Sequence, residues 1–309
     1  MARLWTRERY GAGHRGFMDP FRRILFPVDF SKASLNMASY VREMADRFAA
    51  TVTVVHAFDL LRDYVDGPDE LDDESESPAI PYTAAVQAIR NARRRRLEEF
   101  AAAQLPNASL VTRVEDGAAA AVIEWEVQRE GIGLIMMPTK GLGKFRRMLL
   151  GSVTAKVLHD VTCPMFTSVH DCDVVPAIAG YGSIVCAVDV NQECDAVLEA
   201  ASFLAQAYRA KLCLAHIPSA PPGSGESEAS ELLRRALAKV INQGNNEPTI
   251  PVKVRMWNEE VTQGIRVISV EEKAELLIVG RGHERGNVSR LWSHLYAIIR
   301  DSHCPVLSV

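Results

Sequence analysis

The chain has 309 residues, which is too long for one domain of ordinary size and fits two domains of about 150 residues each. Its apolar share of 48% and charged share of 24% are those of a globular protein, and no apolar run approaches the roughly 20 residues that span a bilayer. A formal net charge of −4 excludes a general attraction to nucleic acid or anionic lipid. We therefore expect a soluble protein with neither a nucleic-acid nor a membrane partner.

Residues 1–20 form a basic N-terminal tail that we leave out of the fold. The tail lacks the apolar core of a signal peptide, so it gives no reason to expect export. The six cysteines include no CxxC pair and several lie inside apolar runs, which favours reduced thiols. These features predict a cytoplasmic location.

The first elements predicted along the chain alternate between strand and helix. An apolar strand begins at Ile24, and a helix spans about residues 31–49. One face of this helix is apolar and carries Leu35, Ala38, Val41, Met44, Ala45 and Phe48. The acidic segment 66–78 is expected to be a mobile loop. The helix after it carries the basic run 93–96, interpreted as solvated surface.

The apolar strand 134–137 leads into the segment PTKGLGKFRRMLLGSV, residues 138–153. A strand that delivers glycines and a serine to a helix start is typical of a phosphate site, because free backbone N–H groups and the helix dipole both face the anion. Gly141 and Gly143 alternatively form only a turn. The basic side chains of this segment favour an anion or belong to a solvated face; they are Lys140, Lys144, Arg146 and Arg147.

The chain is internally duplicated. Residues 24–31 (ILFPVDFS) align with residues 184–191 (IVCAVDVN), and residues 54–57 (VVHA) align with residues 214–217 (LAHI). The halves close on the similar segments 163–169 (CPMFTSV) and 304–309 (CPVLSV). Each half is therefore one structural unit, and we place these units at residues 21–172 and 180–309.

The alternation of strands and helices predicts an α/β fold with two tandem, doubly wound, Rossmann-like parallel sheets. The closing strands 164–169 and 305–309 are short apolar edges, and such edges are normally paired or covered. We expect the two halves to pack through them. A homodimer of the whole chain is a further expectation.

The two halves resemble the universal stress protein family. The resemblance rests on the first strand ILFPVDFS, the HA or HI pair that ends the second strand, and Gly141 separated by nine residues from Gly151-Ser152. ATP-binding members of that family look like G-x2-G-x9-G-[ST], and the first half departs from this pattern only in having Pro138 for the first glycine. The implied fold is adenine nucleotide hydrolase-like, and the implied ligand is ATP, alone or with Mg²⁺.

The resemblance also implies which residues of the first half hold the nucleotide. Asp29 lies near adenine and ribose, the backbone of Ala57 lies at the adenine edge, and the glycine loop surrounds the phosphates. The full expected set is Pro27, Val28, Asp29, Ala57, Thr139, Gly141, Gly151, Ser152 and Val153. Without a ligand, Asp29 and Ser31 only cap the first helix. His56 is interpreted as a hydrogen-bonded histidine at a strand end.

The second half is expected to bind more weakly. Counting back from Cys304 places Trp292 where Gly151 lies in the first half, and an indole there obstructs a phosphate. The remaining candidates for a weaker second site are Asp189, Ile217, Gly280, Gly282 and Ser293. The histidines 283, 294 and 303 match no zinc-site spacing, so no metal site is predicted.

Three functional hypotheses follow. The first is a cytoplasmic, stress-response regulatory protein that binds ATP mainly in its first half and presents a changed surface to an unidentified protein partner. The second is a scaffold whose pockets are vestigial. The third, an ATP-using enzyme, is disfavoured because the sequence has no GxxxxGK[ST] loop and no evident base or nucleophile beside the phosphates, so at most slow ATP hydrolysis is expected.

Overall fold

A computed structural model describes residues 20–59, 82–139, 150–168, 180–188, 194–216, 231, 233, 235, 238, 251–256, 260–281, 283–284, 287–288 and 290–309. For residues 20, 82, 83, 85, 256, 283, 284, 287, 288 and 290–293 it describes the backbone alone. The acidic segment 66–78, and with it the prediction of its mobility, lies outside these residues. No helix within these ranges is long and apolar enough to cross a membrane.

The first half alternates strands and helices as predicted. A short 3-10 turn, η2 (Pro20–Arg22), leads into it. The elements are β1 (Arg23–Pro27), α1 (Lys32–Phe48), β2 (Thr51–Phe58), α3 (Tyr82–Gln104), β3 (Ser109–Asp116), α4 (Ala119–Glu130), β4 (Leu134–Met137), α5 (Ser152–Asp160) and β5 (Met165–Thr167).

The described elements of the second half follow the same order, apart from a helix between its second and third strands, and include a small hairpin before the last helix. Its elements are β6 (Ser183–Val188), α6 (Asp195–Tyr208), β7 (Lys211–His216), β8 (Val252–Met256), α8 (Val261–Glu271), β9 (Leu276–Val279), β10 (His283–Glu284), β11 (Asn287–Val288), α9 (Arg290–Asp301) and β12 (Val306–Ser308). The antiparallel hairpin β10–β11 was not predicted from the sequence.

All long strands join one ten-stranded sheet in the order β3-β2-β1-β4-β5-β12-β9-β6-β7-β8. Within each half the strands are parallel, and the order reverses beside the first strand: β1 lies between β2 and β4, and β6 lies between β7 and β9. Ligands of doubly wound sheets bind at such reversals, beyond the carboxyl ends of the strands. The predicted fold class is confirmed.

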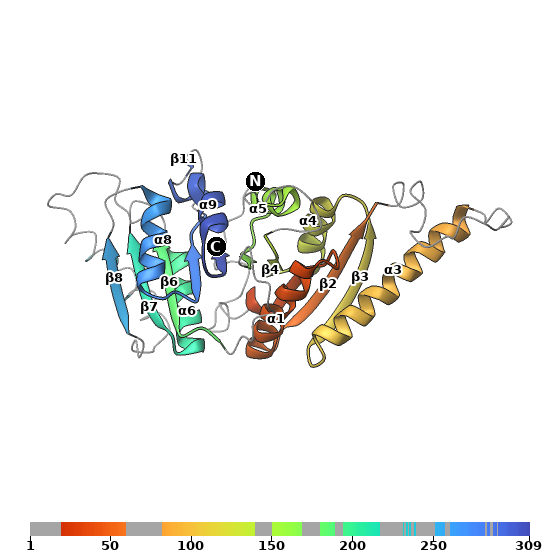
Figure 1. Ribbon diagram of the computed structural model, residues 1–309, viewed down its shortest axis with the longest axis horizontal. Helices are drawn as coiled ribbons and strands as arrows, with labels where there is room; N and C mark the ends of the chain where they lie inside the picture. Colours follow the sequence, from red (N-terminus) through yellow and green to blue (C-terminus); the bar gives the residue numbers. More distant parts are fainter. Residues whose placement is uncertain are drawn as a thin grey trace.

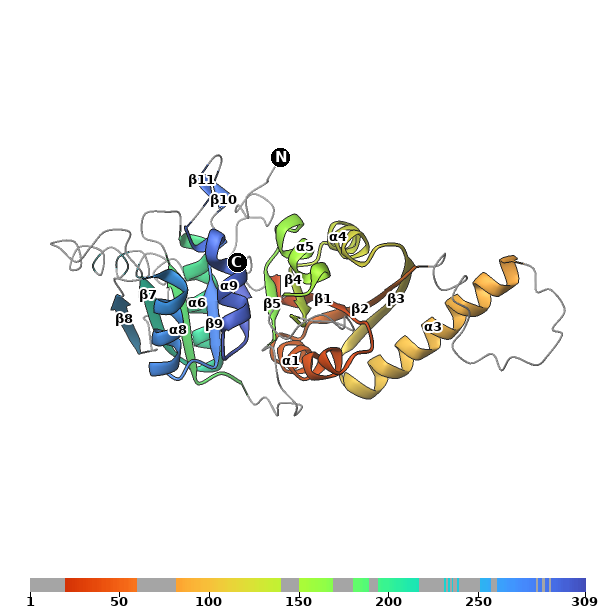
Figure 2. The same ribbon diagram turned by 45° about the horizontal axis from the view of Figure 1, so that its top comes forward.

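Helices cover both faces of the sheet (Figures 1 and 2). In the first half the side chains of β1 alternate: Ile24 and Phe26 join the core under α1 and α3, whereas Leu25 joins the core under α4 and α5. The core under α1 and α3 continues beneath α6, and the opposite core continues beneath α8 and α9. Two apolar layers therefore run through both halves.

The closing strands join the halves, as predicted. Strand β5 pairs antiparallel with β12, with Phe166 opposite Leu307 and Met165 opposite Ser308. The hydroxyl of Thr167 donates to the carbonyl of Val306 at 3.3 Å. This pairing removes both exposed edges and turns two five-stranded sheets into one.

Helix α1 begins and ends where the sequence predicts, with Ser31 as its N-cap and Ala49 as its C-cap. Helix α6 of the second half packs against it. The ring of Phe48 lies 5.4 Å from that of Phe203, and the hydroxyl of Tyr208 contacts the sulfur of Met44 at 3.1 Å. Met44 and Phe48 belong to the predicted apolar face, so part of this face packs against the other half of the chain.

Candidate functional site

The candidate site lies at the carboxyl edge of the sheet, where the order reverses between β1 and β4. Because these strands are adjacent and parallel, the residues that follow them emerge side by side: Val28 and Asp29 after β1, and Thr139 after β4. Pro27 ends β1, and Ala57 lies near the end of the neighbouring strand β2. The fold thus brings five of the predicted residues to one edge.

The start of α5 is tied to the end of β4. The backbone N–H of Gly151 donates to the carbonyl of Thr139 at 2.8 Å, and the hydroxyl of Thr154 donates to the carbonyl of Pro138 at 3.0 Å. Both acceptors follow β4 directly, so the helix starts at the same edge as Asp29. Gly141, in the loop between them, lies outside the described residues.

The first turn of α5 offers backbone N–H groups to an anion. Gly151 is the N-cap and has no capping side chain, and its own N–H is already used by Thr139. Ser152 and Val153 follow in the first turn, where a helix has no acceptor of its own, and both residues are exposed. The first intrahelical bond runs from the N–H of Ala155 to the carbonyl of Gly151, so the N–H groups of Ser152, Val153 and Thr154 have no partner within the helix. Ser152 and Val153 are the exposed ones, and Gly151 has no side chain that would hinder close approach.

Asp29 organises the turn that enters α1. One of its carboxylate oxygens accepts hydrogen bonds from the N–H of Ser31 at 3.0 Å and from the hydroxyl of Ser34 at 2.6 Å. Ser31 then caps the helix by accepting from the N–H of Ser34 at 3.2 Å. The capping role of this stretch is confirmed, and contact of Asp29 with a nucleotide stays a prediction.

Sequence reasoning missed Phe30 as part of this edge. Phe30 has a φ of 59°, a left-handed conformation that is uncommon for a residue with a bulky side chain. Its ring lies 4.6 Å from the imidazole of His56, and the guanidinium of Arg96 lies 4.3 Å above the same ring. No sequence pattern signals this geometry. Arg96 is therefore anchored by an aromatic ring, which the interpretation of its segment as solvated surface did not include.

His56 is hydrogen-bonded near a strand end, as predicted, through one of its two ring nitrogens. Its Nδ1 lies 2.8 Å from the carbonyl of Val28, and since a carbonyl can only accept, Nδ1 carries the proton. Nε2 is then an acceptor; it is buried and has no hydrogen-bond partner among the described residues. His56 therefore locks the end of β2 to the end of β1.

The pKa of His56 gives a testable pH dependence. Burial lowers this pKa below the ordinary value of 6.5, and the nearby cations Arg93 and Arg96 lower it further. Below pH 6.5 the unfolded chain therefore takes up a proton that the folded chain refuses, so stability is full above this pH and falls as the pH drops towards the folded pKa.

We expect His56→Asn, whose amide can still donate to Val28 but cannot titrate, to flatten the fall in unfolding free energy between about pH 7 and pH 5. Urea unfolding at several pH values measures this. Identical pH slopes for the variant and the natural protein would contradict it.

The second half keeps the histidine lock but changes the helix start. Nδ1 of His216 lies 3.1 Å from the carbonyl of Val188, as in the first half. Helices α5 and α9 both end at an aspartate, but α9 begins at Arg290, so Trp292 lies inside its first turn and Ser293 is its fourth residue. The N–H of Ser293 therefore falls beyond the N–H groups that a helix start leaves free.

The remaining candidates of the second half are only partly described. Gly280 directly follows β9 at the carboxyl edge. Asp189, Ile217 and Gly282 lie outside the described residues. Within the described residues, no group of three or more histidine, cysteine or acidic side chains is arranged to hold a metal ion.

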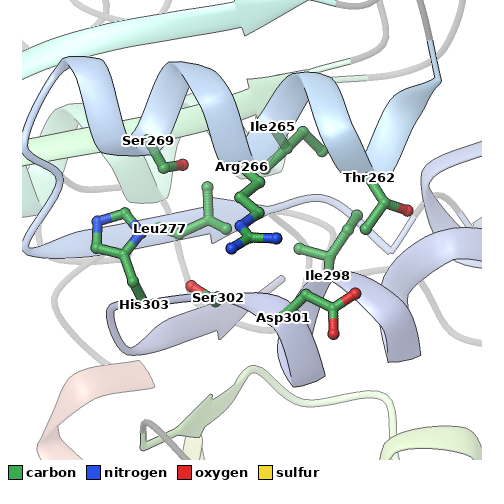
Figure 3. A pocket seen from close by; sticks show the side chains of 9 residues that line it. All are labelled: Thr262, Ile265, Arg266, Ser269, Leu277, Ile298, Asp301, Ser302 and His303. Atoms are coloured by element: carbon green, nitrogen blue, oxygen red, sulfur yellow. The ribbon is translucent and has the colours of Figure 1, made fainter.

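A shallow hollow elsewhere in the second half shares no residue with the candidate site (Figure 3). It lies between α8 and α9. Its lining residues are Thr262, Ile265, Arg266, Ser269, Leu277, Ile298, Asp301, Ser302 and His303. The lining includes the last residue of α9 and the turn that follows it, so it lies at the opposite end of that helix from its start at Arg290.

Comparison with known proteins identifies both halves. The universal stress protein family matches residues 20–167 and again residues 180–309. A Thermus aquaticus relative, named as the universal stress protein in the QAH/OAS sulfhydrylase 3′ region, is 27% identical over 145 residues, which are 47% of this chain and 96% of that protein.

Solved structures share the two-unit fold over nearly the whole chain. A universal stress protein from Archaeoglobus fulgidus is 21% identical with a TM-score of 0.64, covering 93% of this chain and 96% of its own. A structure from Pseudomonas aeruginosa is 15% identical with a TM-score of 0.59 and covers 94% of each chain. With both halves matched separately, the chain belongs to the universal stress protein family and has its tandem form.

Proposed function

We propose that this protein is a cytoplasmic regulatory protein of the stress response that binds ATP in its first half. The observation that carries the proposal is the meeting of Asp29, the start of α5 and the strand ends at one edge, where the sheet order reverses. The proposed ligand contacts are Pro27, Val28, Asp29, Ala57, Thr139, Gly141, Gly151, Ser152 and Val153. Membership of the universal stress protein family supports a role in stress responses. That the ligand is ATP is our proposal.

The phosphate end of the proposed site is built from α5. The N–H groups of Ser152 and Val153 and the positive end of the helix dipole favour an anion there. Pro138 cannot donate a backbone N–H, which removes one hydrogen bond worth about 1 kcal/mol, less than tenfold in affinity. Its carbonyl instead anchors Thr154, so the proline weakens one contact and keeps the helix start in place.

The adenine end is built from β1 and β2. The lock between His56 and Val28 fixes the two strand ends at which Asp29 and Ala57 lie. One carboxylate oxygen of Asp29 accepts the two hydrogen bonds of the turn before α1. The proposal gives the same carboxylate a second role, as acceptor for an amino or hydroxyl donor of the nucleoside.

The proposal predicts about one ATP bound per chain by calorimetric titration with Mg²⁺ present. We expect Asp29→Asn to keep the turn, because the amide oxygen can still accept from Ser31 and Ser34, but to weaken ATP binding roughly tenfold by losing the charged acceptor. Unchanged affinity would leave Asp29 with a capping role alone. If the natural protein retains no ATP at millimolar concentration, the scaffold hypothesis replaces the regulatory one.

A further inference from the structure

One side chain of the second half crosses into the first half and holds the end of α5. Arg281 is 3% exposed and follows β9 by two residues. Its Nη1 donates to the carbonyl of Val161 at 2.6 Å, and its Nε and Nη2 donate to the hydroxyl of Ser308 at 3.1 and 3.0 Å. Ser308 in turn donates to the carbonyl of Met165 at 3.2 Å. The guanidinium therefore bonds to both halves at once.

The bond from Arg281 to Val161 acts on the C-terminal end of α5. Val161 is the C-cap of α5, and its ψ of 136° turns its carbonyl out of the helical direction, so no N–H of the helix bonds to it. The C-terminal end of the helix also carries the partial negative charge of the dipole. A cation there satisfies an orphan carbonyl and complements the dipole. Burial lowers the pKa of Arg281 to about 10, so it is still charged near neutral pH.

A second side chain from the same half supports the middle of α5. The hydroxyl of Tyr296, on α9, donates to the carbonyl of Ala155 at 3.2 Å, and its ring packs against the apolar core beneath both helices. The start of α5 is bonded to Thr139 and Pro138 of its own half. Helix α5 thus packs against α4 of its own half, and the second half adds hydrogen bonds at its middle and its end.

The position of Arg281 in the second half corresponds to that of Thr139 in the first half. It follows β9 by two residues, as Thr139 follows β4. In the first half this position receives the N–H of Gly151 and starts the phosphate-facing helix. In the second half the residue at this position is Arg281, whose side chain crosses the junction and bonds to Val161 at the C-terminal end of α5.

We propose that Arg281 is a positioning residue for the nucleotide site of the first half, and that the second half thereby controls how firmly the phosphate-binding helix is held. The inference rests on the proposed function for its link to ATP. That Arg281 holds the C-terminal end of α5 does not depend on which ligand is bound. Because α5 is short, movement at its C-terminal end is transmitted to Ser152 and Val153 at its start.

The test compares Arg281→Met with Arg281→Lys and Tyr296→Phe by amide hydrogen exchange and by ATP titration. Arg281→Met removes the donor to Val161 while filling similar space, and we expect exchange within residues 152–161 to quicken roughly tenfold and ATP affinity to fall several-fold. Arg281→Lys keeps the charge and should recover part of both effects. Tyr296→Phe, which removes a single hydroxyl, should show a smaller change in the same direction.

Arg255→Gln is the matched control, since Arg255 pairs with Glu271 and Glu272 within the second half. It should leave the exchange of α5 unchanged. Equal quickening in this control, or none in Arg281→Met, would overturn the inference. Faster exchange with unaltered ATP affinity would overturn the link to the site. If the natural protein binds no ATP, the proposed function fails while the exchange data still decide whether Arg281 holds α5.

Discussion

Gly151→Trp is expected to abolish ATP binding while leaving the protein folded. The substitution places in the first half the residue that stands at the corresponding position of the second half, Trp292. An indole at the N-cap of α5 would occupy the space through which a phosphate reaches the N–H groups of Ser152 and Val153. Calorimetric titration should change from about one ATP per chain to none.

The backbone at Gly151 makes this a clean experiment. Its φ of −60° and ψ of 141° are accessible to any residue, so the substitution adds no backbone strain. Replacing glycine at an N-cap costs at most about 1 kcal/mol. Gly151→Ala is the matched control and should retain most of the ATP affinity. A folded tryptophan variant that still binds one ATP would refute the site assignment.

The structure adds a reason for the expected asymmetry between the halves. In the first half the helix that follows β4 starts at Ser152. In the second half the corresponding segment contains the hairpin β10–β11 and a helix that starts earlier, at Arg290. Helix α9 starts before Trp292, whereas α5 starts after Gly151. The second half therefore differs from the first both in the tryptophan and in the residue at which the helix begins.

Most of the fold could be predicted from local patterns in the sequence. The repeat fixed the order of strands and helices in both halves, since each half could be checked against the other. The edge rule predicted the pairing of β5 with β12 because short apolar edge strands need a partner. Helix α1 was placed between Ser31 and Ala49 from its cap and its period alone.

The features that could not be predicted from the sequence depend on contacts between distant segments of the chain. Arg281 looks like a loop residue, and only the packing of the halves makes it a helix cap for α5. The left-handed Phe30 is neither glycine nor asparagine, so no residue preference announces it. His56 was expected to be hydrogen-bonded at a strand end, but its partner, Val28, is 28 residues away in the chain and could not be named from the sequence.

Phe166→Ala should produce the largest loss of stability, about 3–5 kcal/mol, because it empties a fully buried aromatic site. Phe166 lies in β5, opposite Leu307 of β12, and its ring is 5.4 Å from that of Tyr40. The cavity would therefore open at the strand pair that joins the halves. Urea unfolding followed by circular dichroism measures the loss.

The distinctive part of this prediction is where the damage spreads. Leu97→Ala, the control, empties an equally buried site on α3, remote from the junction strands. It should loosen the first half and leave the amide exchange of β9 and β12 close to that of the natural protein. Phe166→Ala should quicken exchange in those second-half strands as well, since β12 lies between β5 and β9 in the sheet. Exchange in β12 that stays at its natural rate in this variant would show that the two halves hold their structure independently, despite sharing one sheet.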